Sequence, residues 1–144
     1  MAEIHRICTF TLGDCLFGIP VEHIREVLHG PPLTRVPPAP RVVLGLLNLR
    51  GEIVTAVDLG LFLGIPETSP ARIAVVVTST LGTVGLFVDA VGEVLELSED
   101  RFEPPPDTLW DPPRSLLAGI YALEDRLLLA LDVDRTLHAL ASNS

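Results

Sequence analysis

A chain of 144 residues suits one domain or two small ones, and could bury roughly 68% of its unfolded surface if compact. Its formal net charge of −9 argues against a nucleic-acid partner, because such a partner needs a basic surface. No apolar run approaches the roughly 20 residues of a membrane span, and the first ten residues show no signal-peptide pattern. We therefore expect a cytoplasmic protein without direct membrane insertion.

The N-terminal segment is predicted to form a hairpin. Residues 7–12 alternate between two faces, and residues 15–19 form the return strand. In the register of a tight turn the two cysteines, Cys8 and Cys15, do not lie opposite each other. We interpret both as small buried hydrophobic residues rather than as a disulfide or a metal-binding pair.

The segment from Pro20 to Leu28 has apolar residues at helical spacing, and Pro20 suits the first turn of a helix. Its counterpart in the internal repeat described below looks extended, so we expect a helical start and an extended finish. Residues 29–40 contain five prolines and are predicted to form an extended connection. Residues 37–40 also satisfy a P-x-x-P pattern, but a rigid linker is the favoured interpretation over an SH3 ligand.

Residues 45–63, GLLNLRGEIVTAVDLGLFL, form the central pattern of the chain. Two apolar runs around Arg50 and Gly51 predict a hairpin, and Gly51 supplies the positive φ that its turn needs. Asp58 is expected to cap the short apolar helix that follows. The runs are so apolar that we expect the hairpin to be buried on both faces or nearly so, which makes an arginine at its tip conspicuous.

The same pattern returns near the C-terminus as residues 119–137, at an offset of 74 positions (119 − 45), with Asp132 in the place of Asp58. A second block, residues 18–28, matches residues 85–95 at an offset of 67 (85 − 18). Two matching blocks in the same order suggest one fold used twice. Each copy alone would be marginal in core size, so we expect the two to share a hydrophobic core.

The other predicted elements are a loop at 67–70, a hairpin of 72–78 and 83–88, a capped turn at 98–102, a Pro-rich loop at 103–113 and a C-terminal helix starting at Asp132. The only tryptophan, Trp110, lies in the Pro-rich loop, where a lid over the core is favoured over a binding hot spot. Many short strands between Gly or Pro turns, with helices confined to the ends, favour two small all-β barrels.

The sequence offers little catalytic chemistry. It contains no Gly-rich phosphate loop, metal-ligand cluster or nucleophile elbow, so we predict no catalytic residue, no metal site and no cofactor. Asp58 and Asp132 could suggest a carboxylate pair, but their equivalence in the repeat favours two helix caps. The chain is therefore predicted not to be an enzyme.

Two charged residues stand out as candidates for a surface role. In the repeat Glu26 matches Glu93, whereas Arg50 falls on Glu124. This difference hints at a role for Arg50 that is specific to the first barrel. A solvated turn residue explains Arg50 equally well from the pattern alone.

Residues 48–59, NLRGEIVTAVDL, resemble the NLRG-x-I-V-P-V-x-DL signature of CheW-like domains, the coupling proteins of bacterial chemotaxis arrays. Further blocks resemble the family at residues 10–14, 17–21, 24–27, 35–40, 84–91 and 117–120. The resemblance covers roughly residues 7–140, and several blocks in a fixed order are more specific than one short motif.

The resemblance implies a single CheW-like domain over residues 1–144, made of two five-stranded SH3-like barrels packed on a shared hydrophobic core. We place the first barrel at residues 15–66 and the second at residues 7–14 and 71–140. The resemblance also implies a non-catalytic adaptor that joins the cytoplasmic tip of a methyl-accepting chemoreceptor to the regulatory domain of a CheA-type histidine kinase. Such an adaptor would be cytoplasmic and recruited to membrane receptor arrays.

The family's motif also suggests site residues. A charged pair near the receptor and kinase interfaces falls on Glu26 and Arg50, with neighbouring apolar or close-approach positions alongside. The predicted partner-binding residues are Glu26, Arg50, Ile24, Val27, Gly45 and Asn48. The predicted turn and cap residues are Gly51, Asp58 and Asp132.

The sequence departs from the signature at three places. Thr55 stands where proline is usual, Ala56 is smaller than the usual valine, and Gly60 stands where arginine often follows. None of these puts a charge in the core, so we expect the barrels to persist. Thr55 and Gly60 leave a second hypothesis open, in which a divergent double barrel serves as a structural or competing subunit of another kinase signalling pathway.

Overall fold

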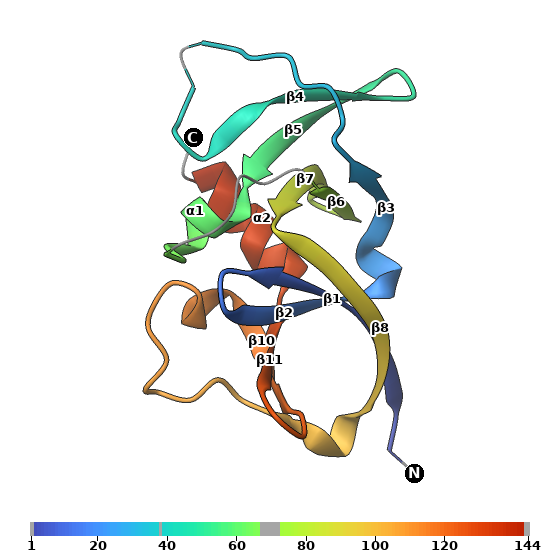
Figure 1. Ribbon diagram of the computed structural model, residues 1–144, viewed down its shortest axis with the longest axis vertical. Helices are drawn as coiled ribbons and strands as arrows, with labels where there is room; N and C mark the ends of the chain where they lie inside the picture. The colour runs from blue at the N-terminus through green and yellow to red at the C-terminus, as the bar shows by residue number, and fades with distance from the viewer. Residues whose placement is uncertain (1, 38, 67–72, 143–144) are drawn as a thin grey trace.

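The computed structural model describes residues 2–37, 39–66 and 73–142, and it is mainly β, with its strands in two sheets (Figure 1). The five-stranded sheet, here called the first barrel, has the order β3 (Ile24–His29), β6 (Ile73–Ser79), β7 (Gly82–Val88), β5 (Glu52–Asp58) and β4 (Val43–Leu49). The six-stranded sheet, here called the second barrel, has the order β8 (Ala90–Ser98), β1 (Ile4–Leu12), β2 (Cys15–Pro20), β11 (Leu127–Leu131), β10 (Leu117–Ala122) and β9 (Phe102–Glu103).

The two sheets repeat the same pairing scheme. In the second barrel, β1 pairs with β2 and β8, and β2 lies parallel to β11. In the first barrel, β6 pairs with β7 and β3, and β7 lies parallel to β5. The internal repeat is therefore a structural repeat, in which the opening hairpin of each copy joins the sheet of the other copy.

This exchange corrects the predicted subdomains. The strand from Cys15, which we placed in the first barrel, belongs to the second, and β6 and β7 belong to the first rather than to the second. The strands of the first barrel therefore all lie between residues 24 and 88, and those of the second barrel lie in the chain on both sides of this stretch. The observed barrels differ from the predicted ones because a parallel pairing between the two copies completes each sheet. The sequence repeat shows which segments are equivalent, but it does not show this pairing. The second barrel also has six strands rather than five, since β9 adds a two-residue edge strand.

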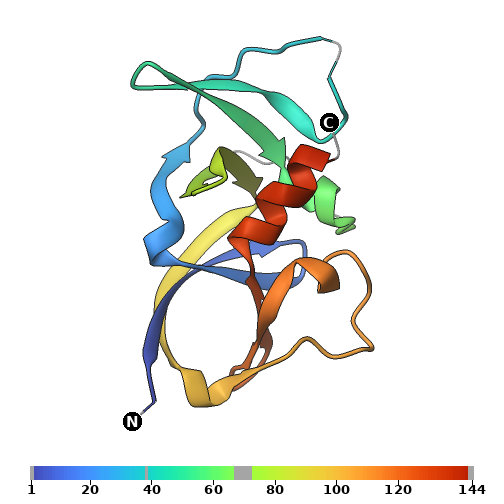
Figure 2. The same cartoon turned by 180° about the vertical axis from the view of Figure 1, so that it is seen from behind.

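A hydrophobic core lies between the barrels, as predicted. It receives side chains from both sheets and from both helices, α1 (Leu59–Leu63) and α2 (Val133–Ser142), which Figure 2 shows from behind. Members from the two sheets and two helices include Phe10, Leu12, Phe17, Ile19, Val75, Val77, Leu86, Val88, Leu59, Leu63, Val133 and Leu137. Smaller clusters fill the interior of each barrel. Burying this shared apolar surface is what binds the two barrels into one unit.

The two aspartates at the ends of the matching hairpins cap helices, as their equivalence predicted. Asp58 Oδ1 accepts a hydrogen bond from the Leu61 N–H at 3.0 Å, and Asp132 Oδ1 accepts one from the Arg135 N–H at 3.0 Å. Each carboxylate satisfies a backbone donor that the first turn of the helix leaves unpaired. The capping role therefore accounts for both carboxylates.

We expect Asp58→Ala and Asp132→Ala each to lower the free energy of unfolding by about 1 kcal/mol, because each removes one helix cap. Urea denaturation followed by circular dichroism measures the loss. Asp125→Ala, at an exposed hairpin turn, is the matched control and should change stability by less than about 0.5 kcal/mol. A loss of several kcal/mol from either cap variant would contradict a capping role and indicate a wider network.

The N-terminal region follows the prediction closely. Cys8 lies opposite Ile19 and Cys15 lies opposite Leu12, and both cysteines are free thiols. Cys8 is buried and Cys15 is half-buried, and burial raises the pKa of both thiols. After Pro20 the chain makes a short 3-10 turn, η1 (Val21–His23), and then continues as β3, so the expected helical start and extended finish are confirmed.

In the Pro-rich loop, Leu109 rather than the predicted Trp110 covers the core. Leu109 packs against the shared core, whereas Trp110 is 45% exposed. The lid interpretation is therefore wrong for Trp110, since the adjacent leucine takes that place. Elsewhere, Ser98 caps the 3-10 turn η2 (Glu99–Arg101) as predicted, and a third short turn, η3 (Arg114–Leu116), precedes β10. The predicted loop at 67–70 lies outside the described residues.

Within the described residues, no helix is both long enough and apolar enough to span a bilayer.

Candidate functional site

The turn of the central hairpin forces an arginine into an unfavourable backbone conformation. Arg50 has φ +53° and Gly51 has φ +90°, so both central residues lie at positive φ, as a type I′ turn requires. Glycine adopts this conformation freely, whereas a non-glycine residue other than Asn or Asp rarely does so, at a cost of about 1 kcal/mol. An arginine at this position is not explained by turn formation, which favours a role for its side chain.

Four charged side chains gather at this turn. Arg50 pairs with Glu26 (Nη2 to Oε1, 3.3 Å), and Arg25 pairs with Glu52 (Nη1 to Oε1, 2.7 Å). Two charges come from β3 and two from the tip of the β4–β5 hairpin, although these strands are not neighbours in the sheet. We call these four residues the charge cluster. The two ion pairs hold the hairpin tip against β3.

The charge cluster is only partly exposed. The Arg50 side chain is 76% exposed, whereas that of Glu26 is 23% exposed. The second carboxylate oxygen of Glu26, Oε2, is buried and has no hydrogen-bond partner among the described residues. Because the Arg50 guanidinium stays in solvent, its ion pair with Glu26 is expected to contribute about 0–1 kcal/mol, so this pair has only a small effect on folding stability.

An exposed apolar side chain lies next to the charge cluster. Ile53, one residue beyond Glu52, is 62% exposed and lies opposite Asn48 in the β4–β5 ladder. The expectation that both faces of the hairpin are buried is therefore wrong. Residues such as Leu47 and Val54 point into the barrel interior, and the alternating positions face outward.

Asn48 has a role within the turn. Its Oδ1 accepts a hydrogen bond from the Gly51 N–H at 2.9 Å, which fixes the turn that carries Arg50. The side chain is exposed, so it lies on the same surface as the charge cluster. Of the six predicted partner-binding residues, Glu26, Arg50 and Asn48 are thus brought to one place.

Gly45 lies at the other end of β4 and is buried. Its φ is +151°, and a Cβ atom there would lie 2.6 Å from the carbonyl oxygen of Thr34. The equivalent Gly119 would place a Cβ against the carbonyl oxygen of Glu103. Both glycines allow a crossing segment to approach, so backbone packing accounts for Gly45.

Ile24 and Val27 lie on β3 on either side of Glu26, with different surroundings. Ile24 is half-buried and packs against the shared core. Val27 is also half-buried and lies opposite Val75 in the ladder. Both therefore support the strand that carries Glu26 and leave part of their surface open to solvent.

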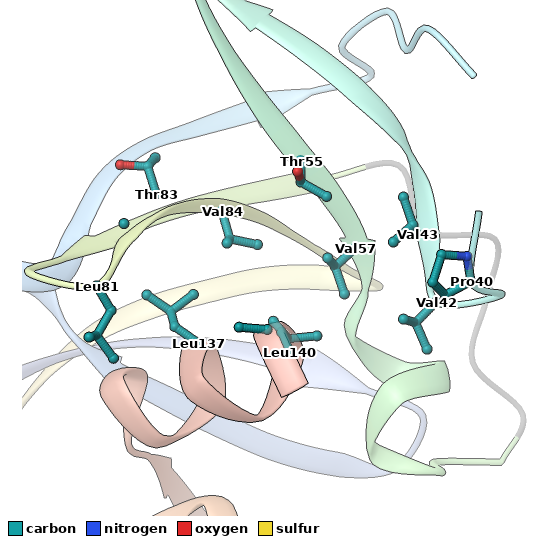
Figure 3. Close-up of a pocket in the computed structure, with 12 residues that line it drawn as sticks. Pro40, Val42, Val43, Thr55, Val57, Leu81, Thr83, Val84, Leu137 and Leu140 are labelled. Atoms are coloured by element: carbon teal, nitrogen blue, oxygen red, sulfur yellow. The ribbon is translucent and has the colours of Figure 1, made fainter. Parts of the chain in front are cut away.

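A separate apolar groove of about 270 Å³ lies between the first barrel and α2 (Figure 3). Leu137 and Leu140 point from the helix towards Val84 and Val57. Among the residues that the structure describes, its lining side chains other than Thr55 and Thr83 are apolar: Pro40, Val42, Val43, Val57, Leu81, Val84, Leu137, Leu140 and Ala141. These described side chains suit the packing of apolar groups rather than acid–base or nucleophilic chemistry.

Comparison with known proteins identifies the family. The CheW-like domain matches residues 6–141, which is nearly the whole chain. The chain belongs to the CheW-like family. The chemotaxis protein CheW of Rhizobium meliloti (strain 1021) is 34% identical over 130 residues, covering 89% of this chain and 84% of that protein. The CheW of Helicobacter pylori (strain ATCC 700392 / 26695) is 31% identical over 137 residues, covering 94% and 82% respectively.

A solved CheW-like structure has the same fold. The crystal structure of the scaffolding protein TtCheW from Thermoanaerobacter tengcongensis matches with a TM-score of 0.79 and 30% identity, covering 91% of this chain and 89% of that one. The two-sheet architecture described above is therefore that of a CheW-like protein. The charge cluster lies on the first barrel of this CheW-like fold, at the NLRG segment that suggested the resemblance.

Sequence reasoning missed part of this site. It proposed Glu26 and Arg50 as a pair, but did not find Arg25, Glu52 or the exposed Ile53. The one indication in the sequence is that Arg25–Glu26 and the hairpin tip with Arg50 and Glu52 each carry one positive and one negative charge, so that the two segments can pair. The pairing of these charges can be inferred only once the structure shows that β3 passes beside the hairpin tip.

Proposed function

We propose that this CheW-like protein is a non-catalytic adaptor that joins the cytoplasmic tip of a methyl-accepting chemoreceptor to the regulatory domain of a CheA-type histidine kinase. It would act in the cytoplasm and be recruited to receptor arrays at the membrane. The single observation that carries the binding site is the charge cluster: an arginine held at positive φ, paired with a half-buried glutamate and flanked by an exposed isoleucine.

The chemistry of this surface suits a protein partner. Arginine is one of the residue types that often account for most of the binding energy of an interface, and the exposed Ile53 beside it offers apolar surface to bury. The hairpin tip is already held by two ion pairs and the Asn48 hydrogen bond, so little ordering is lost on binding. The names of the relatives support the pathway, since they are chemotaxis proteins and a scaffolding protein.

Arg50→Asn is expected to weaken binding to the kinase regulatory domain by about tenfold or more, because it removes the exposed guanidinium. Asparagine tolerates positive φ, so stability should stay within about 1 kcal/mol of the wild type. A pull-down followed by titration calorimetry with the regulatory domain from the same organism measures the affinity. Unfolding of Arg50→Asn would instead show that Arg50 is structural.

Charge reversal tests whether Glu26 and Arg50 act together. Arg50→Glu alone should bind more weakly than Arg50→Asn, because it places two carboxylates side by side. The double variant Glu26→Arg/Arg50→Glu should recover part of the lost affinity if the two residues form a functional pair. No recovery in a folded double variant would mean that each residue contacts the partner separately.

The same binding experiment also tests the alternative hypothesis of a divergent double barrel. Binding that is unaffected by Arg50 variants would keep the adaptor role and move the contact to another face. No binding to any CheA-type regulatory domain would favour a structural or competing subunit of another pathway, which the departures at Thr55 and Gly60 would fit.

A further inference from the structure

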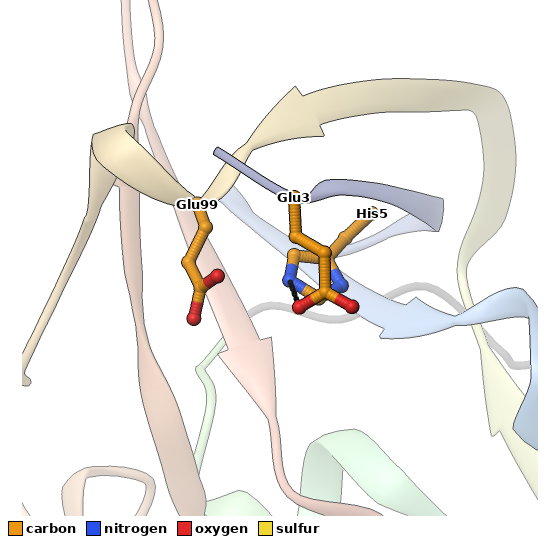
Figure 4. Close-up of side chains that lie close together, drawn as sticks. All are labelled: Glu3, His5 and Glu99. Atoms are coloured by element: carbon orange, nitrogen blue, oxygen red, sulfur yellow. Dashed lines mark ion pairs between the residues drawn. The ribbon is translucent and has the colours of Figure 1, made fainter. Parts of the chain in front are cut away.

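One end of the second barrel brings together three potential metal ligands from two segments that are distant in sequence. Glu3 immediately precedes β1, His5 lies at the start of this strand, and Glu99 opens the turn η2 after β8 (Figure 4). One ligand atom from each lies within 4.8 Å of the others, and Glu3 Oε2 is 4.0 Å from His5 Nε2. The backbone fixes this meeting, because the Glu99 N–H donates to the Glu3 carbonyl oxygen at 2.9 Å.

A tyrosine adds a polar group to the depression beside this cluster. His5, Glu99 and Tyr121 line one depression of about 250 Å³, with Ile7, Phe102 and Ala130 among the apolar residues of its wall. Most of the Tyr121 side chain is buried, at 4% exposure for the residue, and its hydroxyl has no hydrogen-bond partner within the described part of the chain. The hydroxyl oxygen is not among the buried unpaired atoms, so it reaches the solvent of this depression, where a water or a ligand can accept or donate a hydrogen bond.

We propose that Glu3, His5 and Glu99 bind a divalent transition-metal cation of the Zn²⁺ type, with the Tyr121 hydroxyl as a hydrogen-bonding group in the same depression. One imidazole nitrogen and two carboxylate oxygens are ligands that Zn²⁺ accepts, with a remaining position for water. Mg²⁺ and Ca²⁺ prefer six or more oxygen ligands, which this cluster does not offer.

The geometry needs only a small adjustment. Ligand bonds of about 2.0–2.2 Å to a tetrahedral ion place ligand atoms about 3.3 Å apart, somewhat closer than the 4.0 Å between Glu3 and His5. The Glu3 side chain is 76% exposed and free to rotate towards the others. The basic residue on the same turn, Arg101, donates to the Ala122 carbonyl oxygen at 2.7 Å and makes no ion pair with this cluster among the described residues.

Such an ion would link the start of β1 to η2, the turn that follows β8, the strand with which β1 pairs. Sequence analysis predicted no metal site because residues 3 and 5 are more than 90 positions from Glu99. Strand pairing in the register Ile4 to Ser98 is what brings them together.

Titration of the tag-free full chain with zinc chloride, followed by calorimetry, tests the proposal. We expect saturable binding of one ion per chain, weakened at least about tenfold by His5→Ala and by Glu99→Gln. His138→Ala, at an exposed histidine on α2, is the matched control and should leave binding within about twofold. Glu99→Gln keeps the shape of the side chain, so it remains informative if His5→Ala fails to fold.

A spectroscopic readout locates the ion. Tyr121 is the only tyrosine and Trp110 the only tryptophan in the chain. Zinc should therefore perturb the tyrosine absorption of the wild type and leave tryptophan emission unchanged. Absence of saturable binding, binding that His5→Ala and Glu99→Gln leave intact, or an equal loss in His138→Ala would overturn the proposal.

Discussion

Gly45→Ala is expected to lower the free energy of unfolding by about 2–4 kcal/mol. The added Cβ would lie 2.6 Å from the Thr34 carbonyl oxygen, and the residue would be forced to keep φ +151°. Backbone strain and overpacking each cost about 1–3 kcal/mol. The obstructing atom cannot move easily, because Thr34 exchanges hydrogen bonds of 2.9 and 2.8 Å with Leu46. Urea denaturation followed by circular dichroism measures the loss.

Gly51→Ala is the matched control for this change. Gly51 also has positive φ, at +90°, but a Cβ there would meet no atom within 4 Å. Gly51→Ala should therefore lower the free energy of unfolding only by the cost of holding alanine at positive φ, about 1 kcal/mol. If Gly45→Ala were no more destabilising than Gly51→Ala, close packing against Thr34 would not explain the glycine. The requirement would then come from a bound partner, as the sequence comparison with the family first suggested.

Local chemistry allowed several elements to be predicted from the sequence. The Arg50–Gly51 turn, the caps at Asp58 and Asp132 and the register of the first hairpin depend on residues close together in the chain. Each of these interactions is decided by φ preferences, by unpaired N–H groups or by alternation along a strand. The repeat between residues 45–63 and 119–137 added the expectation of two similar barrels.

The assignment of strands to barrels could not be predicted in this way. The repeat identifies which segments are equivalent, but not whether a hairpin pairs within its own copy or with the other. Both choices bury the same apolar faces of β2 and β7. The parallel pairings of β2 with β11 and of β7 with β5 join distant segments, and the energy that selects them is spread over the whole shared core.

The candidate site was predictable only in part for the same reason. The sequence alone could mark Arg50 as unusual, because the second copy has Glu124 in its place. It could not place Arg25 beside Glu52, since their contact depends on how β3 crosses a hairpin with which it forms no ladder. Exposure of Ile53 depends on the same arrangement.

Phe17→Ala is expected to lower the free energy of unfolding by about 3–5 kcal/mol and to destabilise both barrels together. Phe17 is fully buried in the shared core and stacks on Phe10, with ring centroids 5.9 Å apart. Truncating a buried aromatic ring removes its burial energy and leaves a cavity. Although Phe17 belongs to the second barrel, its cluster includes Val75 and Val77 of the first, so the loss should reach both sheets.

Two probes distinguish a shared core from two independent ones. Trp110 fluorescence reports on the Pro-rich loop of the second barrel, and amide hydrogen exchange at Val75 and Val77 reports on the first. In the variant we expect both to show the same reduced stability, since one cooperative unit unfolds in a single step. Leu127→Ala, at a leucine that is 48% exposed in the same sheet, should change neither by more than about 0.5 kcal/mol. If exchange at Val75 kept its wild-type protection while the tryptophan transition shifted, the barrels would be separate folding units. The pairing of each copy's opening hairpin with the other copy's sheet would then join the two barrels without making them unfold together.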